Sequence, residues 1–216
     1  MNFFGAGGGE ALELAFLLHL GSAVAVLAYF RRSLSMPLLR FVGVATAGSA
    51  LSGAPLYLLL VRGFEGASGS AVNVLVGVAL LLTAVMLRLP GGGRKTAEDA
   101  GVRDMLIAGV AQGVAVVPGI SRSGTTLAAL LMLGYSPAEA LRLSFLMAVP
   151  AILGLNLVSA SGMGLSPAAV AGTLMALGVS FLTIHLMLRV AERERFSYLC
   201  LLLGILAIGA GVMGLG

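Results

Sequence analysis

Long apolar runs alternate with short polar breaks along the chain. A helix that crosses a membrane needs about 20 mostly apolar residues, and most of the charged residues stand outside such runs. The predicted spans are 11–30, 38–61, 71–88, 139–159, 167–188 and 197–215. The pattern therefore predicts an all-α polytopic membrane protein, with residues 1–216 forming one integral membrane domain in the cell membrane.

The pattern changes between residues 102 and 135. Two apolar pieces, each shorter than a span, flank the polar stretch Pro118–Thr126, which reads PGISRSGTT. Irregular backbone at membrane depth is tolerated only where it is buried in protein or lines a wet cavity. We therefore predict a re-entrant helical hairpin over 102–135, which a solvated cytoplasmic linker over 89–101 precedes.

Basic residues predict the orientation of the spans, because cytoplasmic loops carry an excess of Lys and Arg. Basic residues cluster after the first span, after the third span and before the last one: Arg31, Arg32, Arg88, Arg94, Lys95, Arg103, Arg189, Arg193 and Arg195. All three clusters lie inside only if the segment 102–135 begins and ends on the same side. Residues 139–159 then cross from inside to outside.

An internal repeat supports this orientation. Residues 10–30 align with 139–159 at an offset of 129, and six of the first eight positions are identical. The two copies cross in opposite senses, which predicts inverted-topology repeats over 10–88 and 139–216, with a site at their interface. A complete pair needs one more hairpin before residue 10, so that hairpin is lost or the sequence begins late.

Composition agrees with a membrane protein and argues against nucleic acid as a partner. Hydrophobic residues make up 59% of the chain and charged residues 10%, whereas soluble domains are nearer a quarter charged. The net charge of +4 reports topology, so nucleic acid is not an expected partner. One cysteine provides no disulfide framework.

The stretch PGISRSGTT has the composition of an anion site. Pro118 and Gly119 can end the incoming helix, and Ser123 or a neighbour can cap the outgoing one. The start of that helix then favours a negative charge. Arg122 adds a planar cation suited to phosphate, and Gly124 permits close backbone approach.

Hydroxyl groups complete this predicted site. Ser121, Ser123 and Thr126 can donate to the remaining phosphate oxygens, so the residues favour phosphate or diphosphate over a neutral ligand. The alternative is a helix break whose arginine reaches the interface or caps carbonyl groups.

The stretch 108–154 resembles the second signature region of undecaprenyl-diphosphatases, the bacitracin-resistance family. In that family, Gln or Glu precedes Pro-Gly-x-Ser-Arg-Ser-Gly-x-Thr, and a Ser-Phe-Leu-x-x-x-Pro helix follows. This chain has Gln112, the Pro118–Thr126 motif, and then Ser144–Leu146 and Pro150. Residues 17–32 and 195–208 resemble further helices of the family.

The resemblance implies an integral membrane enzyme that converts a polyprenyl diphosphate into the monophosphate lipid carrier and inorganic phosphate. It implies that Arg122 clamps the diphosphate and that Ser121, Ser123 and Thr126 contribute hydroxyl contacts. A divalent cation, Mg²⁺ or Ca²⁺, is expected to bridge phosphate oxygens. The family's first signature, a glutamate-rich hairpin, should precede residue 10, so no metal ligand is assigned here.

Further candidates for binding the polyprenyl diphosphate flank these residues. Gly119 and Gly124 allow the substrate to approach the backbone, and Gln112 either bonds the motif loop or faces another helix. Glu13 and His19, in the first span, are candidates for the same cavity. Near the motif, we also expect Glu139 and Arg142 to pair locally on one helix.

A second function stays open at this stage. A non-catalytic polyprenyl-phosphate binding or translocating protein would keep the anion site, and inverted repeats would suit alternating access. The membrane and the lipid diphosphate are the expected partners, and a homo-oligomer is left open.

Overall fold

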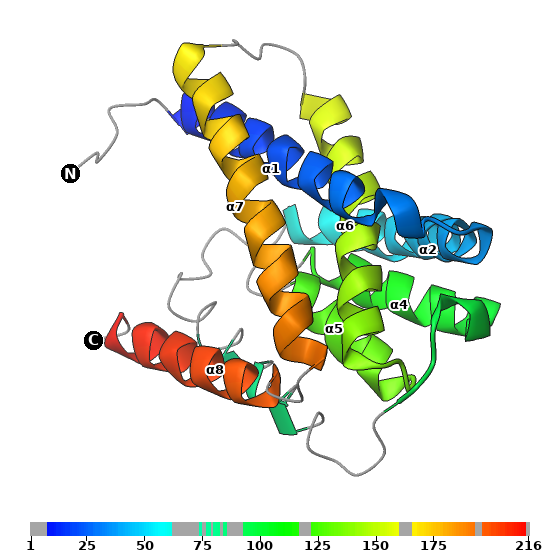
Figure 1. The fold of residues 1–216 in the computed structure, drawn as a ribbon. Coiled ribbons are helices and arrows are strands. Elements are labelled where there is room, and N and C mark those ends of the chain that lie inside the picture. The colour runs from blue at the N-terminus through cyan, green and yellow to red at the C-terminus, as the bar shows by residue number, and fades with distance from the viewer. Residues whose placement is uncertain are drawn as a thin grey trace. The chain divides into compact units, whose positions relative to one another are not determined.

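The computed structural model describes residues 8–61, 74, 77–78, 80–82, 84–85, 93–116, 122–159, 166–192 and 196–214. The elements in chain order (Figure 1) are α1 (Gly8–Phe30), η1 (Arg31–Ser33), α2 (Met36–Val61), η2 (Ala97–Asp99), α4 (Val102–Val114), α5 (Arg122–Met132), α6 (Pro137–Ser159), α7 (Pro167–Glu192) and α8 (Phe196–Met213). Within these ranges the only extended pairing is an isolated bridge between Lys95 and Tyr135. The predicted all-α class is confirmed.

Among the described residues, four helices are long and apolar enough to cross a membrane. Their candidate spans are Leu14–Ser33, Met36–Leu58, Pro137–Gly154 and Ala169–Val190. Helix α8 contributes a shorter apolar stretch, Leu201–Met213, and most of the predicted span 71–88 lies outside the described residues. The protein is therefore a multi-pass membrane protein, as the hydropathy pattern predicts.

Helices α1 and α6 match each other in length and in register. Each has 23 residues, and the offset of 129 found in the sequence carries Gly8–Phe30 onto Pro137–Ser159. Helices α2 and α7 also agree in length, with 26 residues each. These lengths support an internal repeat, and its inverted orientation stays a prediction.

The chain divides into two compact units. The first contains Met1–Leu34 and Phe145–Met187, and the second contains Ser35–Ser144 and Leu188–Gly216. Boundaries between the units fall within α6 and within α7, so each of these helices contributes residues to both. The single membrane domain expected from the sequence stays a prediction.

In the first unit, α1 packs against α7 (Figure 1). Gly21 allows the approach, since a side chain there would meet the backbone oxygen of Thr173. Ser180 donates to Ser22 at 2.9 Å, and the Tyr29 hydroxyl lies 3.0 Å from Nδ1 of His185. Small residues and hydroxyl contacts are what hold helices together in lipid.

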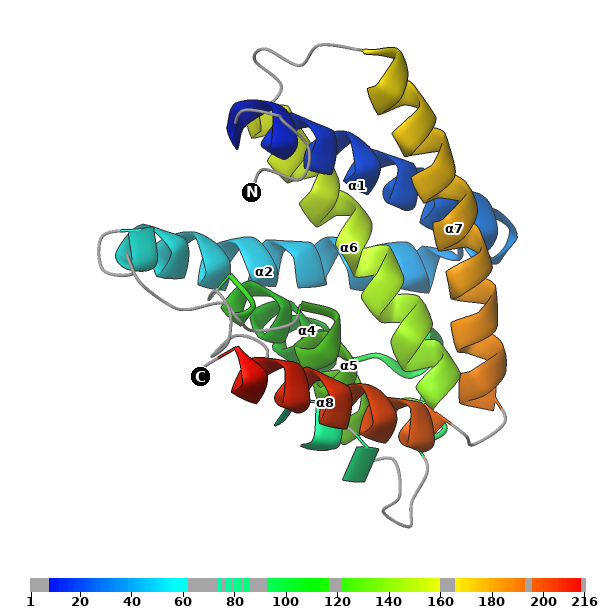
Figure 2. The ribbon, with the colours of Figure 1, turned by 90° about the vertical axis from the view of Figure 1, so that its left-hand side faces the viewer.

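In the second unit, α2 packs closely on α4, and α5 lies beside α4 (Figure 2). Gly109 of α4 faces the backbone of Ala45, and Gly113 faces the backbone of Ser49 and Gly53. The buried apolar side chains of this unit include Leu38, Phe41, Met105, Leu130 and Leu143.

The linker before α4 is only partly solvated, contrary to expectation. Glu98 and Asp99 are exposed, but Ala97 is 1% exposed. Lys95 N–H donates to the carbonyl of Gly134 at 3.1 Å, and Ser136 N–H donates to the carbonyl of Lys95 at 3.3 Å. These backbone bonds join the linker to the turn between α5 and α6, a contact between distant segments that local composition does not reveal.

Candidate functional site

The predicted break between two short helices is present. Helix α4 ends at Val114, where the amides of Ala115 and Val116 donate to the carbonyls of Gln112 and Gly113, and α5 begins at Arg122. Both helices are too short to span a bilayer alone, at about 20 Å and 16 Å. Pro118, Gly119 and Ser121 lie outside the described residues, so their predicted roles stay predictions.

Arg122 is the first residue of α5. It is half-buried, and the next residue, Ser123, is exposed. The helix dipole places its positive end at this turn, and the guanidinium group adds a full charge. Since α5 begins at Arg122, Ser123 lies within the first turn of the helix.

Two threonine hydroxyls fix this first turn. Thr125 and Thr126 both donate to the backbone carbonyl of Arg122, at 3.2 Å and 2.8 Å. Thr126 is fully buried, and Gly124 is buried as well. In this arrangement the Thr126 hydroxyl orients the backbone that carries Arg122. Its predicted contact with a phosphate oxygen stays a prediction.

Gln112 faces the neighbouring helix. It is 4% exposed, and its Nε2 donates to the Ser49 hydroxyl of α2 at 3.4 Å. The structure thus shows the contact with another helix, and the alternative contact with the motif loop stays a prediction. That contact ties the last turn of α4, just before the motif, to α2.

Glu13 and His19 lie in α1, within the first unit, whereas Arg122 lies in the second. His19 is exposed, and the side chain of Glu13 is outside the described part of the chain. The participation of these two residues in the Arg122 site therefore stays a prediction.

Lys95, Asp104 and Tyr135 form a polar cluster that sequence reasoning missed. Asp104 Oδ2 accepts from Lys95 Nζ at 3.1 Å and from the Tyr135 hydroxyl at 3.3 Å. Burial raises the pKa of Tyr135 well above its ordinary value, and the adjacent Asp104 carboxylate raises it further. The available signal is an aspartate in the first turn of a mostly apolar helix.

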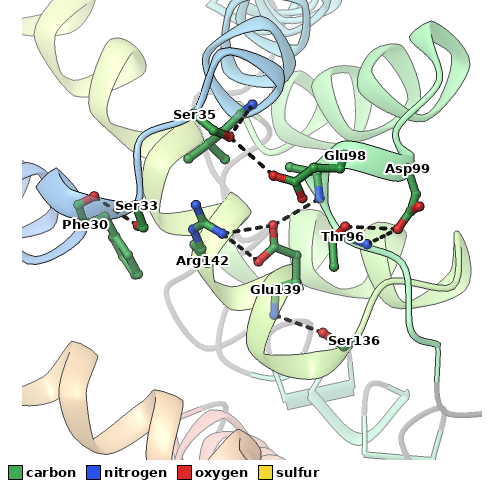
Figure 3. A network of polar contacts seen from close by, with 11 residues as sticks. Phe30, Ser33, Ser35, Thr96, Glu98, Asp99, Ser136, Glu139 and Arg142 are labelled. Carbon is green, nitrogen blue, oxygen red and sulfur yellow. Dashed lines mark hydrogen bonds and ion pairs between the residues drawn. The ribbon is translucent and has the colours of Figure 1, made fainter.

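Glu139 and Arg142 form the predicted local pair, with a separation of 3.1 Å between Nη1 and Oε2. The structure adds a contact from the linker, since Ala97 N–H donates to Oε1 of Glu139 at 3.2 Å (Figure 3). Glu139 is 8% exposed. Its carboxylate thus joins the linker to the first turns of α6.

No group of three His, Cys, Asp or Glu side chains suited to a metal ion occurs among the described residues. A cavity of about 570 Å³ opens at the start of α2, where Arg40, Glu98 and Met105 contribute to its walls. None of its described lining residues belongs to the motif. The features that point to anion chemistry are therefore Arg122 and the start of α5.

The fold and the Arg122 turn define a class: an all-α, multi-pass membrane protein with an arginine at the start of a short helix in a broken helix pair. Within that class, the family model described as "Bacitracin resistance protein BacA" matches residues 2–207. The chain belongs to this family.

Several curated relatives are named undecaprenyl-diphosphatase. The protein from Methanopyrus kandleri is 40% identical, over 96% of this chain and 84% of its own length. The relative from Methanothrix thermoacetophila is 38% identical, over 92% and 81%. The one from Methanococcoides burtonii is 35% identical, over 96% and 86%.

Proposed function

We propose that this protein is a polyprenyl-diphosphate phosphatase. Water would cleave the terminal phosphoanhydride bond of an undecaprenyl-type diphosphate, leaving the lipid monophosphate and inorganic phosphate. The observation that carries the proposal is Arg122 at the positive end of α5, in a chain of the BacA family. The names of the curated relatives support the substrate class.

The chemistry that Arg122 can supply is electrostatic. Phosphoryl transfer gathers negative charge on the oxygens of the transferred group, and positioned cations stabilise that charge. A guanidinium group can contact two of these oxygens at once, and the dipole of α5 acts in the same direction. The hydroxyls of Thr125 and Thr126 hold the Arg122 backbone in place for this role.

A divalent cation, Mg²⁺ or Ca²⁺, is part of this proposal. When bound, it would supply charge at the diphosphate. The described residues offer no cluster of ligands that fits such an ion, so no step is derived through it. Chelation with EDTA should abolish phosphate release, and Mg²⁺ or Ca²⁺ should restore it. Full activity in EDTA would remove the cation from the proposal.

Phosphate release from undecaprenyl diphosphate in detergent tests the function. We expect release by the wild type, and Arg122→Ala to lower kcat roughly a hundredfold or more, as the loss of a transition-state donor does. Arg122→Lys should be intermediate, because it keeps the charge and loses the fork. Arg103→Ala is the matched control: Arg103 is an exposed arginine on α4, and its removal should leave the rate nearly unchanged.

Two results would contradict the proposal. Release that is unchanged in Arg122→Ala would remove Arg122 from the site. Absence of release, together with retained binding of the lipid diphosphate, would favour a non-catalytic polyprenyl-phosphate binding or translocating protein.

A further inference from the structure

We propose that Lys95, Asp104 and Tyr135 are positioning residues that close the base of the α4–α5 hairpin and thereby hold Arg122 where the diphosphate binds. We call these three residues the base cluster. The proposal rests on the function proposed above and gives roles to residues outside the Pro118–Thr126 motif.

The base cluster joins the two ends of the hairpin. Asp104 lies in the first turn of α4 and is 9% exposed. Tyr135 stands three positions after the last residue of α5 and just before α6, and it is fully buried. A single oxygen, Oδ2 of Asp104, accepts from Tyr135 at 3.3 Å and from Lys95 at 3.1 Å. The start of α4 and the chain leaving α5 therefore share one hydrogen-bonded centre.

Backbone contacts hold Tyr135 in this position. The bonds from Lys95 N–H to Gly134 and from Ser136 N–H to Lys95 bracket the tyrosine. Gly134 has φ +89°, a conformation that glycine adopts without the steric cost other residues incur. The Tyr135 ring also packs edge-on against Phe41 of α2, with 6.0 Å between ring centroids.

A second contact anchors the same linker to α6. Ala97, two residues after Lys95, donates its N–H to Glu139, which also binds Arg142 (Figure 3). One short stretch of linker thus binds the start of α4, the end of α5 and the start of α6. These contacts from the linker hold the two ends of the hairpin in place.

The position of the base affects Arg122 because α5 is one short helix. Its 11 residues place Arg122 about 16 Å from the end that Tyr135 follows, so a shift of that end moves the arginine. A misplacement of about 1 Å between reacting groups can cost roughly a hundredfold in rate. Removing a hydrogen-bond donor leaves the buried Asp104 carboxylate less well compensated. We expect the base of the hairpin to shift in response.

Tyr135→Phe is the test variant, since it removes the hydroxyl and keeps the ring. Tyr29→Phe is its matched control, because it removes a hydroxyl that lies 3.0 Å from His185 in the other unit. We expect Tyr135→Phe to lower kcat/KM about tenfold and the control to stay near wild type. The two variants should have similar melting temperatures in detergent. Equal activities would overturn the proposal.

Coupling to Arg122 separates positioning from general stability. If the base cluster acts through Arg122, Tyr135→Phe should cause little further loss in an Arg122→Lys background. Lys95→Arg, which keeps a cationic donor, should retain activity, and Lys95→Met should lose it as Tyr135→Phe does. An equal loss in both Arg122 backgrounds would show a merely structural role.

Thiol labelling tests the base cluster without turnover. Cys200 is the only cysteine, so Ser123→Cys with Cys200→Ser places a single label on the exposed first turn of α5. Tyr135→Phe should change the labelling rate several-fold, and Tyr29→Phe should not. A changed labelling rate, together with no phosphate release by the wild-type chain, would refute the proposed function and keep the positioning role. An unchanged rate would refute that role.

Discussion

The carboxylate of Glu139 serves two segments at once. It accepts from Ala97 N–H at 3.2 Å and pairs with Arg142 at 3.1 Å (Figure 3). The side chains of the pair are 10% and 20% exposed, so little solvent screens them. A group in this position stabilises a tertiary contact, whereas an exposed helix pair with the same spacing contributes only a few tenths of a kcal/mol.

Glu139→Gln should therefore destabilise the protein. The amide oxygen can still accept from Ala97, but the Arg142 guanidinium group loses the charge beside it. Removing a charged hydrogen-bonding partner of a buried group costs about 1–3 kcal/mol, so the melting temperature in detergent should fall. Glu98→Gln is the control, since Glu98 is exposed and lies 3.4 Å from the Ser35 hydroxyl. Equal melting temperatures for the two variants would contradict the assigned role.

Asp99 gives the linker a dependence on pH. The amide and hydroxyl of Thr96 donate to Asp99 Oδ2 at 2.8 Å and 3.0 Å. The hydrogen bond from the Thr96 backbone, followed by the one from its hydroxyl, lowers the pKa of Asp99 below its ordinary value of 3.8. A lowered pKa means that ionised Asp99 stabilises the folded linker above pH 3.8, and that this contribution is lost as the pH falls through the lowered pKa.

Hydrogen exchange can measure this effect. The protection factor of the Thr96 amide, corrected for the intrinsic exchange rate, should fall as the pH is lowered below about 4. Asp99→Asn should show low protection at every pH, because its side chain no longer carries the charge. A protection factor in the wild type that is constant from pH 6 to about 3 would contradict the role of Asp99.

At the scale of elements, close contact between helices depends on residues without side chains. A Cβ atom on Gly109 would collide with the backbone of Ala45, and one on Gly113 would lie 2.7 Å from the carbonyl oxygen of Ser49. The α2–α4 seam therefore requires glycine at these positions. The seam supports the hairpin on the side where Gln112 donates to Ser49.

Gly109→Ala should push α2 and α4 apart. Backbone atoms cannot rotate away as a side chain can, so we expect a loss of about 1–3 kcal/mol in stability and lower phosphatase activity. Gly43→Ala on α2 is the matched control, since nothing lies within 4 Å of its added carbon. It should be neutral or stabilising by up to about 1 kcal/mol, because alanine favours helix. Thermal unfolding of both variants in detergent checks this, and equal losses would refute a specific seam.

The sequence predicts the positions of the helices better than the tertiary contacts between segments. Hydropathy predicts α1, α2, α6 and α7, because a helix that crosses the lipid needs a continuous apolar run of sufficient length, and such a run can be read from the sequence. Pro118 and Gly119 predict the gap between α4 and α5. The spacing of Glu139 and Arg142 predicts that they pair. The contact from Ala97 to Glu139 is made by tertiary packing between residues 42 positions apart in the sequence.

In the candidate site, too, the sequence predicts some residues and not others. Arg122 is recognisable from its motif, since a charged residue within an apolar segment is a functional candidate by default. The base cluster is not recognisable in this way. Lys95 and Tyr135 are separated by 40 positions, and no periodic pattern joins a linker lysine to a tyrosine between two helices.

At the scale of the molecule, the base cluster bears on topology. Contacts between Lys95 and Asp104, and between Asp104 and Tyr135, bring the two ends of the hairpin together. Hydrogen bonds between the two ends favour the predicted re-entrant path, in which both ends lie on the same face of a membrane. Helix α6 follows with 23 residues, about 35 Å, enough for one crossing, and α7, with 26 residues, is long enough to return.

Single-cysteine labelling should reveal this path. In a Cys200→Ser background, Arg94→Cys and Arg189→Cys should react with a membrane-impermeant thiol reagent only from the cytoplasmic side. Ser166→Cys should react from the external side, because α6 separates it from the hairpin. All three positions are exposed, and Ala25→Cys, at a fully buried position of α1, should stay unlabelled. If Arg94→Cys and Arg189→Cys reacted from opposite sides, the hairpin would cross the membrane, and both the re-entrant path and the inverted repeat would be wrong.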